Sequence, residues 1–348
     1  MSQFGISLYL GYGYEKNKEI VEKAHKYNAK YAFTSLHIPE ESVSDYEKEV
    51  KKLLDVCKIN NLNLIVDVGP RTLEKMGFSS FKELRQTSIT HLRLDYGFTY
   101  EQIIELSKEF NIMFNASTLS EKDIKELKKL NGDFSKFSAC HNFYPKPLTG
   151  LSLKKVLKIN QRLKNLGITT IAFVAGNKSL RGPLYKGLPT VEEHRDCNVL
   201  FNVLQLIKDC DTDICMIGDV DITDEAWNSL KELSEGYISV HAEIDEKYSF
   251  IKGIVQHDRP DSSDYVIRSQ ESREFSSQGR IFEPELLKKR KKGSISIGNQ
   301  DYLRYSGELE IARQDLEKEP KVNIIGKVCV DDIKYLDYIT DGMGFKLV

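Results

Sequence analysis

The stretch that decides the fold begins with NLIVDV at residues 63–68 and ends with HLRLD at residues 91–95. Both runs are short and rich in apolar residues, which is typical of strands buried in a sheet. Successive side chains of a strand point to opposite faces. Asp67 and Asp95 therefore each lie on the inner face at the end of a strand, Asp95 together with Arg93, while the leucines between them face the other way.

The same alternation of a short β-rich run with a longer amphipathic run continues on both sides of this stretch. Strands are predicted near residues 4–10, 31–35, 63–68, 91–95, 112–116, 137–141, 168–175 and 214–218. Helices are predicted near residues 16–27, 43–60, 100–110, 121–130, 153–166, 195–210 and 224–235, with an irregular segment at 76–87. Eight β-then-α units match an α/β fold of the TIM (β/α)8 barrel type better than an open doubly wound sheet, which usually has fewer strands.

The pattern changes after Gly236. Residues 237–348 contain no long amphipathic run, and Gly, Pro, Asp and Asn separate their alternating segments. These segments predict strands within residues 247–257, 264–269, 293–299, 307–312 and 321–330. We therefore expect two domains, a barrel over residues 1–236 and a small β-rich domain over residues 237–348.

Composition and charge exclude several classes of protein. The 348 residues carry 50 Lys and Arg against 52 Asp and Glu, a net charge of −2, which argues against a nucleic-acid partner. No run of about 18 apolar residues is present, so no membrane-spanning helix is expected. The N-terminal residues have no basic segment followed by a cleavage site, and we therefore expect a cytoplasmic protein.

The cysteines give no sign of a metal site. All six are scattered without a CxxC pair, and the sequence contains neither an HExxH motif nor a phosphate-binding P-loop. We expect reduced thiols and a protein that needs neither a metal ion nor an organic cofactor.

The two strand-end carboxylates are the first candidates for chemistry. Barrel active sites lie at the carboxyl ends of the strands, and two neighbouring carboxylates there suit acid, base or nucleophile roles. We assign Asp95 as nucleophile or orienting carboxylate, kept ionised by Arg93, and Asp67 as general acid. Alternatively, each carboxylate caps its loop or pairs with Arg93 or Arg71. Asp219, at the end of the eighth strand, is the reserve candidate.

Two loops add candidate binding residues. His141, Asn142 and Tyr144, with Phe143, follow the sixth strand and offer the hydrogen-bonding and flat apolar groups that suit a sugar. The alternative is an ordinary polar turn before Pro145.

The loop after the seventh strand, residues 176–196, is long, and long loops at a barrel mouth are usually functional. Arg181 and Tyr185 are its candidate contacts with substrate. Glu192 and Glu193 are reserve acids, although glutamates at the start of a helix are common for structural reasons.

The densest polar motif is HDRPDSSDYVIRSQESR, residues 257–273. His257, Arg268, Ser269 and Arg273 suit an anion such as phosphate or carboxylate, because guanidinium groups bind these groups with paired hydrogen bonds. The alternative is a structural network of arginines and aspartates, which we favour for Arg259.

Long segments of the chain resemble one known family. FGISLYLG, TSLHIPEE, HLRLDYGF, CHNFYPKPLTGLS, AFVAGNKSLRGPLYKGLPTVEEHR and HDRPDSSDYVIRSQESR are similar to the 6-phospho-N-acetylmuramidase family, whose members were once labelled outer surface proteins of unknown function. The resemblance covers almost the whole chain. It implies a TIM barrel followed by a cyclophilin-like β-barrel, with the second domain contributing to the substrate site.

The resemblance also implies an activity. It points to a cytoplasmic exo-glycosidase of peptidoglycan recycling that splits N-acetylmuramic acid 6-phosphate–N-acetylglucosamine into its two sugars. The implied partner is this phosphorylated amino-sugar disaccharide, with no nucleic acid and no membrane. The chemical route stays open between a covalent intermediate, an inverting water and attack by the substrate's own acetamido group.

Two other functions fit the same residues. One is a phosphosugar-processing barrel enzyme of another class, which would need a lysine at an inner strand end or clustered metal ligands. The predicted strands hold no such lysine. The other is a non-catalytic sugar-binding protein, for which paired carboxylates would not be required.

Overall fold

The computed structural model describes residues 3–35, 46–69, 72–75, 78, 80–94, 97–196, 198–272, 274–277 and 279–348. The chain forms two compact units, residues 2–231 and residues 232–348, whose contacts are mostly internal to each unit.

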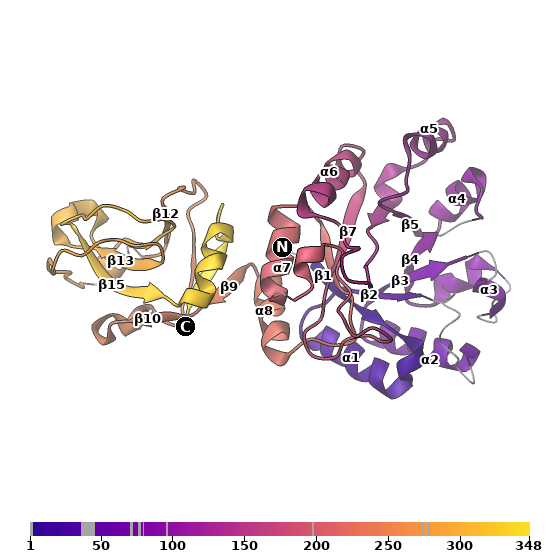
Figure 1. Cartoon of the computed structure of the whole chain (residues 1–348), viewed down its shortest axis with the longest axis horizontal. Helices are drawn as coiled ribbons and strands as arrows, with labels where there is room; N and C mark the ends of the chain where they lie inside the picture. Colours follow the sequence, from indigo (N-terminus) through magenta and orange to yellow (C-terminus); the bar gives the residue numbers. More distant parts are fainter. Residues whose placement is uncertain are drawn as a thin grey trace. The chain divides into compact units, whose positions relative to one another are not determined.

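The first unit is a closed barrel of eight parallel strands that follow one another in chain order (Figure 1). The strands are β1 (Gln3–Leu8), β2 (Tyr31–Ser35), β3 (Asn63–Val68), β4 (Ile89–Leu94), β5 (Asn111–Asn115), β6 (Phe137–Cys140), β7 (Thr169–Val174) and β8 (Ile214–Ile217). The predicted TIM barrel is confirmed, and each strand overlaps the range that the sequence predicts for it.

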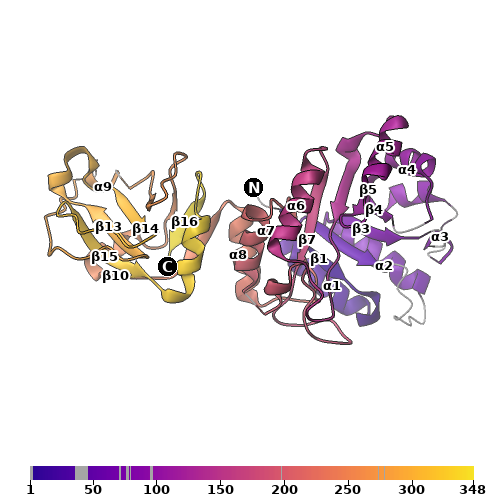
Figure 2. The ribbon, with the colours of Figure 1, turned by 45° about the horizontal axis from the view of Figure 1, so that its top comes forward.

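Helices surround the strands of this unit on the outside (Figures 1 and 2). They are α1 (Tyr14–Lys26), α2 (Tyr46–Ile59), α3 (Thr72–Lys75), α4 (Tyr100–Ser107), α5 (Glu121–Lys129), α6 (Leu153–Lys164), α7 (Val199–Lys208) and α8 (Asp224–Ser234), with 3-10 turns η1 (Leu10–Tyr12), η2 (Phe81–Gln86), η3 (Phe134–Lys136) and η4 (Glu192–His194). Helix α7 begins later than predicted, because the Asn198 side chain accepts the Phe201 N–H and caps it there.

The interior of the barrel is filled by apolar side chains from alternate strand positions. They are Phe33, Ile65, Met113, Cys140, Ile171, Phe173, Ile214 and Met216. Because Ile65 belongs to this interior, Asp67 lies on the same inner face two residues later. The alternation therefore brings the Asp67 carboxylate to the carboxyl end of the barrel.

The second unit is built from two β-sheets. Its strands are β9 (Tyr237–Val240), β10 (Ala242–Ile244), β11 (Val255–His257), β12 (Val266–Arg268), β13 (Ser294–Gly298), β14 (Leu309–Ala312), β15 (Val322–Val328) and β16 (Gly344–Leu347). One sheet has the order β10-β15-β13-β14-β12 and the other β11-β16-β9. Short helical turns complete the unit: η5 (Glu246–Ile251), α9 (Glu274–Ser277), η6 (Gln300–Tyr305) and η7 (Val330–Tyr338).

The segment 246–251 corrects one sequence-based expectation. It forms the 3-10 turn η5, not the start of a strand. Its buried residues are Tyr248 and Ile251, which stand three positions apart. A spacing of three is the period of a 3-10 helix, whereas a half-buried strand needs a spacing of two.

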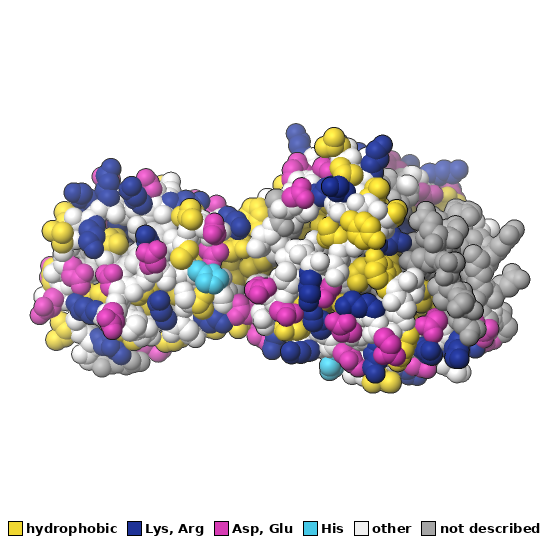
Figure 3. All heavy atoms as spheres, turned by 60° about the horizontal axis from the view of Figure 1, so that its bottom comes forward, with side chains coloured by type: hydrophobic (Ala, Val, Ile, Leu, Met, Phe, Trp, Pro, Cys, Tyr) yellow, Lys and Arg dark blue, Asp and Glu magenta, His cyan; other side chains and the backbone are white. Residues whose placement is uncertain are grey.

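The surface carries charges of both signs. On the face shown in Figure 3, Lys and Arg side chains are interspersed with Asp and Glu on both units, as the net charge of −2 leads one to expect. Within the described residues, no helix combines the length and the apolar character needed to cross a bilayer.

Candidate active site

The carboxyl ends of β3 to β6 carry a connected set of polar side chains. Asp67 and Arg93 are direct neighbours in the pairing of β3 with β4. Arg93 donates from Nη1 to Asp67 Oδ2 at 2.9 Å and from Nη2 to Asn142 Oδ1 at 2.7 Å. Asn115, at the end of β5, donates to the same Asn142 oxygen at 3.2 Å. Four successive strands thus supply one hydrogen-bonded chain that ends in a buried carboxylate.

This chain borders a cavity of about 330 Å³. The cavity is lined by Phe33, Ser35, Asp67, Arg93, His141, Asn142, Phe143, Tyr144 and Phe173. Phe143 packs edge-on against Phe173, with ring centroids 5.1 Å apart. A carboxylate, an amide and a cation therefore meet aromatic faces, a combination that suits a sugar ring, which presents hydroxyls and an apolar face.

The Arg93 guanidinium pairs with Asp67, which is one of the alternatives that the sequence left open for this carboxylate. Because a neighbouring cation stabilises the charged form of a carboxylate, this pairing favours an ionised Asp67. Asp95 itself lies outside the described residues, as does Arg273.

His141 is held by the helix layer. Its Nε2 lies 2.8 Å from Asn160 Oδ1 on α6, while the Asn160 amide donates to the Cys210 carbonyl and to the Thr212 hydroxyl. The imidazole is fully buried, and burial lowers the pKa of His141. Its Nε2 is therefore engaged by the helix layer and does not join the Arg93–Asn142 chain, although His141 lines the same cavity.

Asp219 organises the long loop after β7. Its Oδ2 accepts the N–H groups of Gly176 and Leu188, at 2.8 and 2.9 Å, and its Oδ1 accepts the N–H of Arg181 at 2.9 Å. The side chain is buried, and burial raises the pKa of Asp219 although the three N–H groups oppose that shift. Three backbone donors on one carboxylate make Asp219 an internal anchor for this loop.

Replacing Asp219 by asparagine should loosen this loop. The amide offers one acceptor oxygen in place of two, and its NH2 group faces a backbone donor, so at least one N–H loses its partner. An unsatisfied buried donor costs about 1–3 kcal/mol, which predicts a Tm lower by several degrees and faster proteolysis within residues 176–188. Thermal melting measures the change in Tm, and limited digestion measures the rate of proteolysis. If neither changes in Asp219→Asn, the anchoring role of Asp219 is contradicted.

Arg181 and Tyr185 lie on the loop that Asp219 anchors. The Arg181 guanidinium carbon stands 4.3 Å from the centre of the Tyr9 ring. Stacking of this kind places the face of the guanidinium against the ring. Tyr185 has a left-handed backbone, with φ of 51°, and its side chain is 62% exposed.

Glu192 and Arg195 tie the two mouth loops together. The Glu192 carboxylate accepts the N–H groups of Leu148 and Gly150, both at 2.8 Å, and pairs with Arg195. Arg195 also donates to the carbonyls of Tyr144, Lys146, Lys186 and Gly187. The hydrogen bond from Arg195 lowers the pKa of Glu192 to about 2. Glu192 is therefore a poor proton donor, and together with Arg195 it links residues 144–150 to residues 186–187.

The Glu192–Arg195 pair predicts a pH dependence of stability. A carboxyl whose pKa is lowered on folding stabilises the fold above its ordinary value, and that contribution disappears as the pH falls toward the folded value. The Tm difference between wild type and Glu192→Gln should thus be largest above about pH 5 and should shrink between about 4.5 and 2. Glu193→Gln, at the exposed neighbour, is the control. A difference that stays constant with pH would contradict the prediction.

The polar motif of the second unit forms mostly internal contacts. Asp258 accepts the Arg268 N–H at 3.0 Å and pairs with the buried Arg313. His257 pairs with Glu271, and Arg259 pairs with Asp261. The pairing of Arg259 is the structural alternative that the sequence favoured for it.

Arg268 and Ser269 also have internal partners. Arg268 Nε binds Glu308 Oε1 at 2.8 Å. Ser269 is buried, and its Oγ accepts the Ser272 N–H.

Several site residues were missed from the sequence. Phe33, Ser35 and Phe173 line the cavity, and Asn115 binds Asn142 beside it. Asn115 ends the strand NIMFN as Asp67 nearly ends NLIVDV, so its place at an inner strand end was a usable signal. The two phenylalanines read as core residues, because barrel interiors are filled with apolar side chains.

The described residues contain no metal-site grouping of three His, Cys, Asp or Glu side chains. The cysteines at positions 57, 140, 210, 215 and 329 are free thiols.

Comparison with known proteins places this geometry in a family. No curated protein matches the chain. A conserved protein of unknown function from Enterococcus faecalis shares 31% identity, covers 100% of this chain and 96% of its own, and superposes with a TM-score of 0.79. An uncharacterized protein from B. cereus, 24% identical over 100% of both chains with a TM-score of 0.77, has the same fold.

Two family models match nearly the whole length. The N-terminal model of 6-phospho-N-acetylmuramidase matches residues 4–232, which hold the barrel with its buried carboxylate, and the C-terminal model matches residues 237–348. Together they account for both units, and they confirm the resemblance seen in the sequence. The chain belongs to the 6-phospho-N-acetylmuramidase family, and the activity that this family names is that of a glycoside hydrolase.

Proposed function

We propose that this protein hydrolyses the bond between N-acetylmuramic acid 6-phosphate and N-acetylglucosamine, acting from the chain end, in the cytoplasm and as a step of peptidoglycan recycling. The family match supports the phosphorylated amino sugar as substrate. The observation that carries the proposal is the Asp67–Arg93–Asn142 chain at the barrel mouth, beside an aromatic cavity.

The chemistry fits an ionised carboxylate at this position. Hydrolysis breaks the bond from the anomeric carbon to the bridging oxygen; water supplies a hydroxyl to the carbon, and the leaving oxygen takes a proton. Positive charge builds on the anomeric carbon and ring oxygen in the transition state. Asp67, paired with Arg93, is suited to stabilise that charge, to attack the carbon, or to orient the substrate's acetamido group.

This assignment exchanges the roles first given to the two aspartates. A carboxylate paired with a guanidinium is poorly suited to donate a proton. The general acid is therefore assigned to Asp95, which follows the last residue of β4 in the sequence.

Arg181 is proposed to hold the substrate's phosphate. Many barrels bind phosphate with the loops after the seventh and eighth strands. Here backbone N–H groups of the β7 loop are bound to the Asp219 carboxylate, which serves as an internal anion in that region. Recognition then falls to a side chain. Of the two arginines in this loop, Arg195 is bound to Glu192 and to backbone carbonyls, whereas Arg181 is stacked on Tyr9.

The test is direct incubation. The purified protein is mixed with N-acetylmuramic acid 6-phosphate–N-acetylglucosamine, and the products are followed by mass spectrometry. The expected products are the two sugars, with one water added and the phosphate retained on the muramic acid. Binding without turnover would indicate a sugar-binding protein, and any other product a different class of barrel enzyme; either result overturns the proposal.

A further inference from the structure

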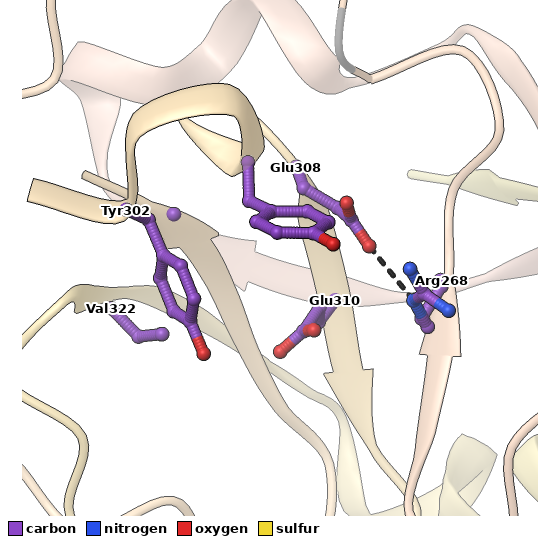
Figure 4. Close-up of a pocket in the computed structure, with 7 residues that line it drawn as sticks. Arg268, Tyr302, Glu308, Glu310 and Val322 are labelled. Carbon is purple, nitrogen blue, oxygen red and sulfur yellow. Dashed lines mark hydrogen bonds and ion pairs between the residues drawn. The ribbon is translucent and has the colours of Figure 1, made fainter. Parts of the chain in front are cut away.

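The second unit contains a cavity of about 340 Å³ to which the proposed hydrolysis gives no role. It is lined by Arg268, Gly298, Tyr302, Tyr305, Glu308, Glu310 and Val322. These residues come from β12, the end of β13, η6, the strand β14 with the residue before it, and β15 (Figure 4).

The floor of this cavity carries charges of both signs. Arg268 and Glu310 face each other across the pairing of β12 with β14, and Glu308 lies two residues before Glu310, on the same side of the chain. Arg268 Nε binds Glu308 Oε1 at 2.8 Å, and Arg290 Nη2 binds Glu310 Oε2 at 2.6 Å. Among the described residues, each of these two carboxylates is thus paired with a guanidinium group.

Both Arg268 and Glu310 have polar atoms that can still form hydrogen bonds with a ligand. Among the described residues, no partner reaches the two terminal nitrogens of Arg268 or the Oε1 atom of Glu310. In the view of Figure 4, Glu310 lies between Tyr302 and Arg268. The cavity therefore presents a donor cation and an acceptor anion next to each other.

The walls are aromatic and apolar. The Tyr302 and Tyr305 rings, both on η6, meet edge-on with centroids 5.9 Å apart, and Val322 completes the lining. Within η6, Leu303 has a left-handed backbone, with φ of 55°, a conformation that costs free energy for a leucine. The segment that carries both rings is thus held in a strained shape over the charged floor.

The two carboxylates beside Arg268 indicate the class of ligand. A phosphate dianion beside Arg268 would also stand beside two carboxylates, which repel it. Burial, and the nearby Glu308, raise the pKa of Glu310. A cationic ligand group beside Glu310 stabilises its charged form against burial and against the repulsion from Glu308. A ligand carboxylate beside Arg268 forms the charge-assisted hydrogen bonds that guanidinium groups favour. Tyrosine rings additionally attract ammonium groups.

We propose that this cavity binds a free α-amino acid with an apolar side chain. Its carboxylate lies on Arg268, its ammonium group on Glu310, and its side chain against the Tyr302 and Tyr305 rings. The proposal is independent of the hydrolytic function, because it rests only on residues of the second unit.

Calorimetric titration of the full-length protein tests the ligand class. L-leucine carries both charges, 3-methylbutylamine carries only the ammonium, and 4-methylpentanoate carries only the carboxylate. We expect one leucine per chain and affinities at least about tenfold weaker for the two single-charge analogues. Stronger binding of inorganic phosphate or N-acetylglucosamine, or equal binding of all three leucine analogues, overturns the proposal.

Variants test the position. Glu310→Gln and Arg268→Gln should each weaken leucine binding at least about tenfold. Tyr302→Ala should also weaken binding, because it removes an aromatic contact of the leucine side chain and leaves both charged groups in place. Glu317→Gln, an exposed glutamate of the same unit, is the matched control and should bind leucine like wild type. Melting curves confirm that each variant is folded. Leucine binding that survives Glu310→Gln and Arg268→Gln unchanged would place the ligand elsewhere and overturn the assignment.

Discussion

Replacing Asp67 by asparagine is expected to lower kcat on the phosphorylated disaccharide by at least about a hundredfold, the low end for loss of a group that acts on the reacting bond. The substitution keeps the size of the side chain and removes the charge that Arg93 balances. KM should change much less than kcat, because the carboxylate acts mainly on charge that develops in the transition state.

The controls separate chemistry from folding. Asp55→Asn makes the same chemical change on the exposed side of α2 and should leave kcat unchanged. Asp95→Asn should be as damaging as Asp67→Asn, whereas Asp219→Asn should change the melting and the digestion of residues 176–188. If Asp67→Asn and Asp95→Asn both keep near wild-type kcat while Asp219→Asn is inactive, the catalytic pair belongs on β8.

Removing the phosphate from the substrate is expected to lower kcat/KM by at least about a hundredfold. A phosphate brings about −1.5 to −2 charges at pH 7, and each charge-assisted hydrogen bond contributes about 1.5–3 kcal/mol. Arg181→Gln should bring kcat/KM for the phosphorylated disaccharide close to that for the unphosphorylated one, and should leave the latter nearly unchanged. Steady-state kinetics on both substrates measure this.

Two comparisons locate the phosphate. Lys178→Gln removes one charge from the same loop and should keep the preference for the phosphorylated substrate. Arg268→Ala tests whether the phosphate binds instead at the anion site that the sequence suggested in the second unit. Loss of the preference in Arg268→Ala alone would move the phosphate to the second unit and would also contradict amino-acid binding there. Equal kcat/KM of the wild type on both substrates would show that no phosphate site exists.

The barrel could be predicted from sequence because its signal is local. Period-two alternation in NLIVDV places Asp67 inside, and the Ser120 cap fixes the beginning of α5 next to the predicted residue. The Asn198 cap is also a local signal, but the predicted start of α7 did not use it. The second unit was less predictable. β10, β11 and β12 have three residues each, which is too short for a period to stand out.

The partners of the site residues depend on long-range contacts. Asp67 meets Arg93, which lies 26 residues further along the chain, because β3 and β4 pair in one particular register. The three N–H donors on Asp219 lie 31 to 43 residues away along the chain, and the Asn160 partner of His141 lies 19 residues on. Residue type and spacing predict that such side chains are polar and point to the inner face of the barrel. Which partners they bind depends on the tertiary fold.

The Asp219 anchor has a consequence for the energetics of binding. A long loop at a barrel mouth is usually ordered by its ligand, and that ordering then opposes association through lost conformational entropy. Here the Asp219 carboxylate accepts the backbone N–H groups of Gly176, Arg181 and Leu188 before any substrate binds. The entropy of ordering this loop is lost when the chain folds, so the mouth is preorganised, and more of the substrate's intrinsic affinity remains to favour the transition state.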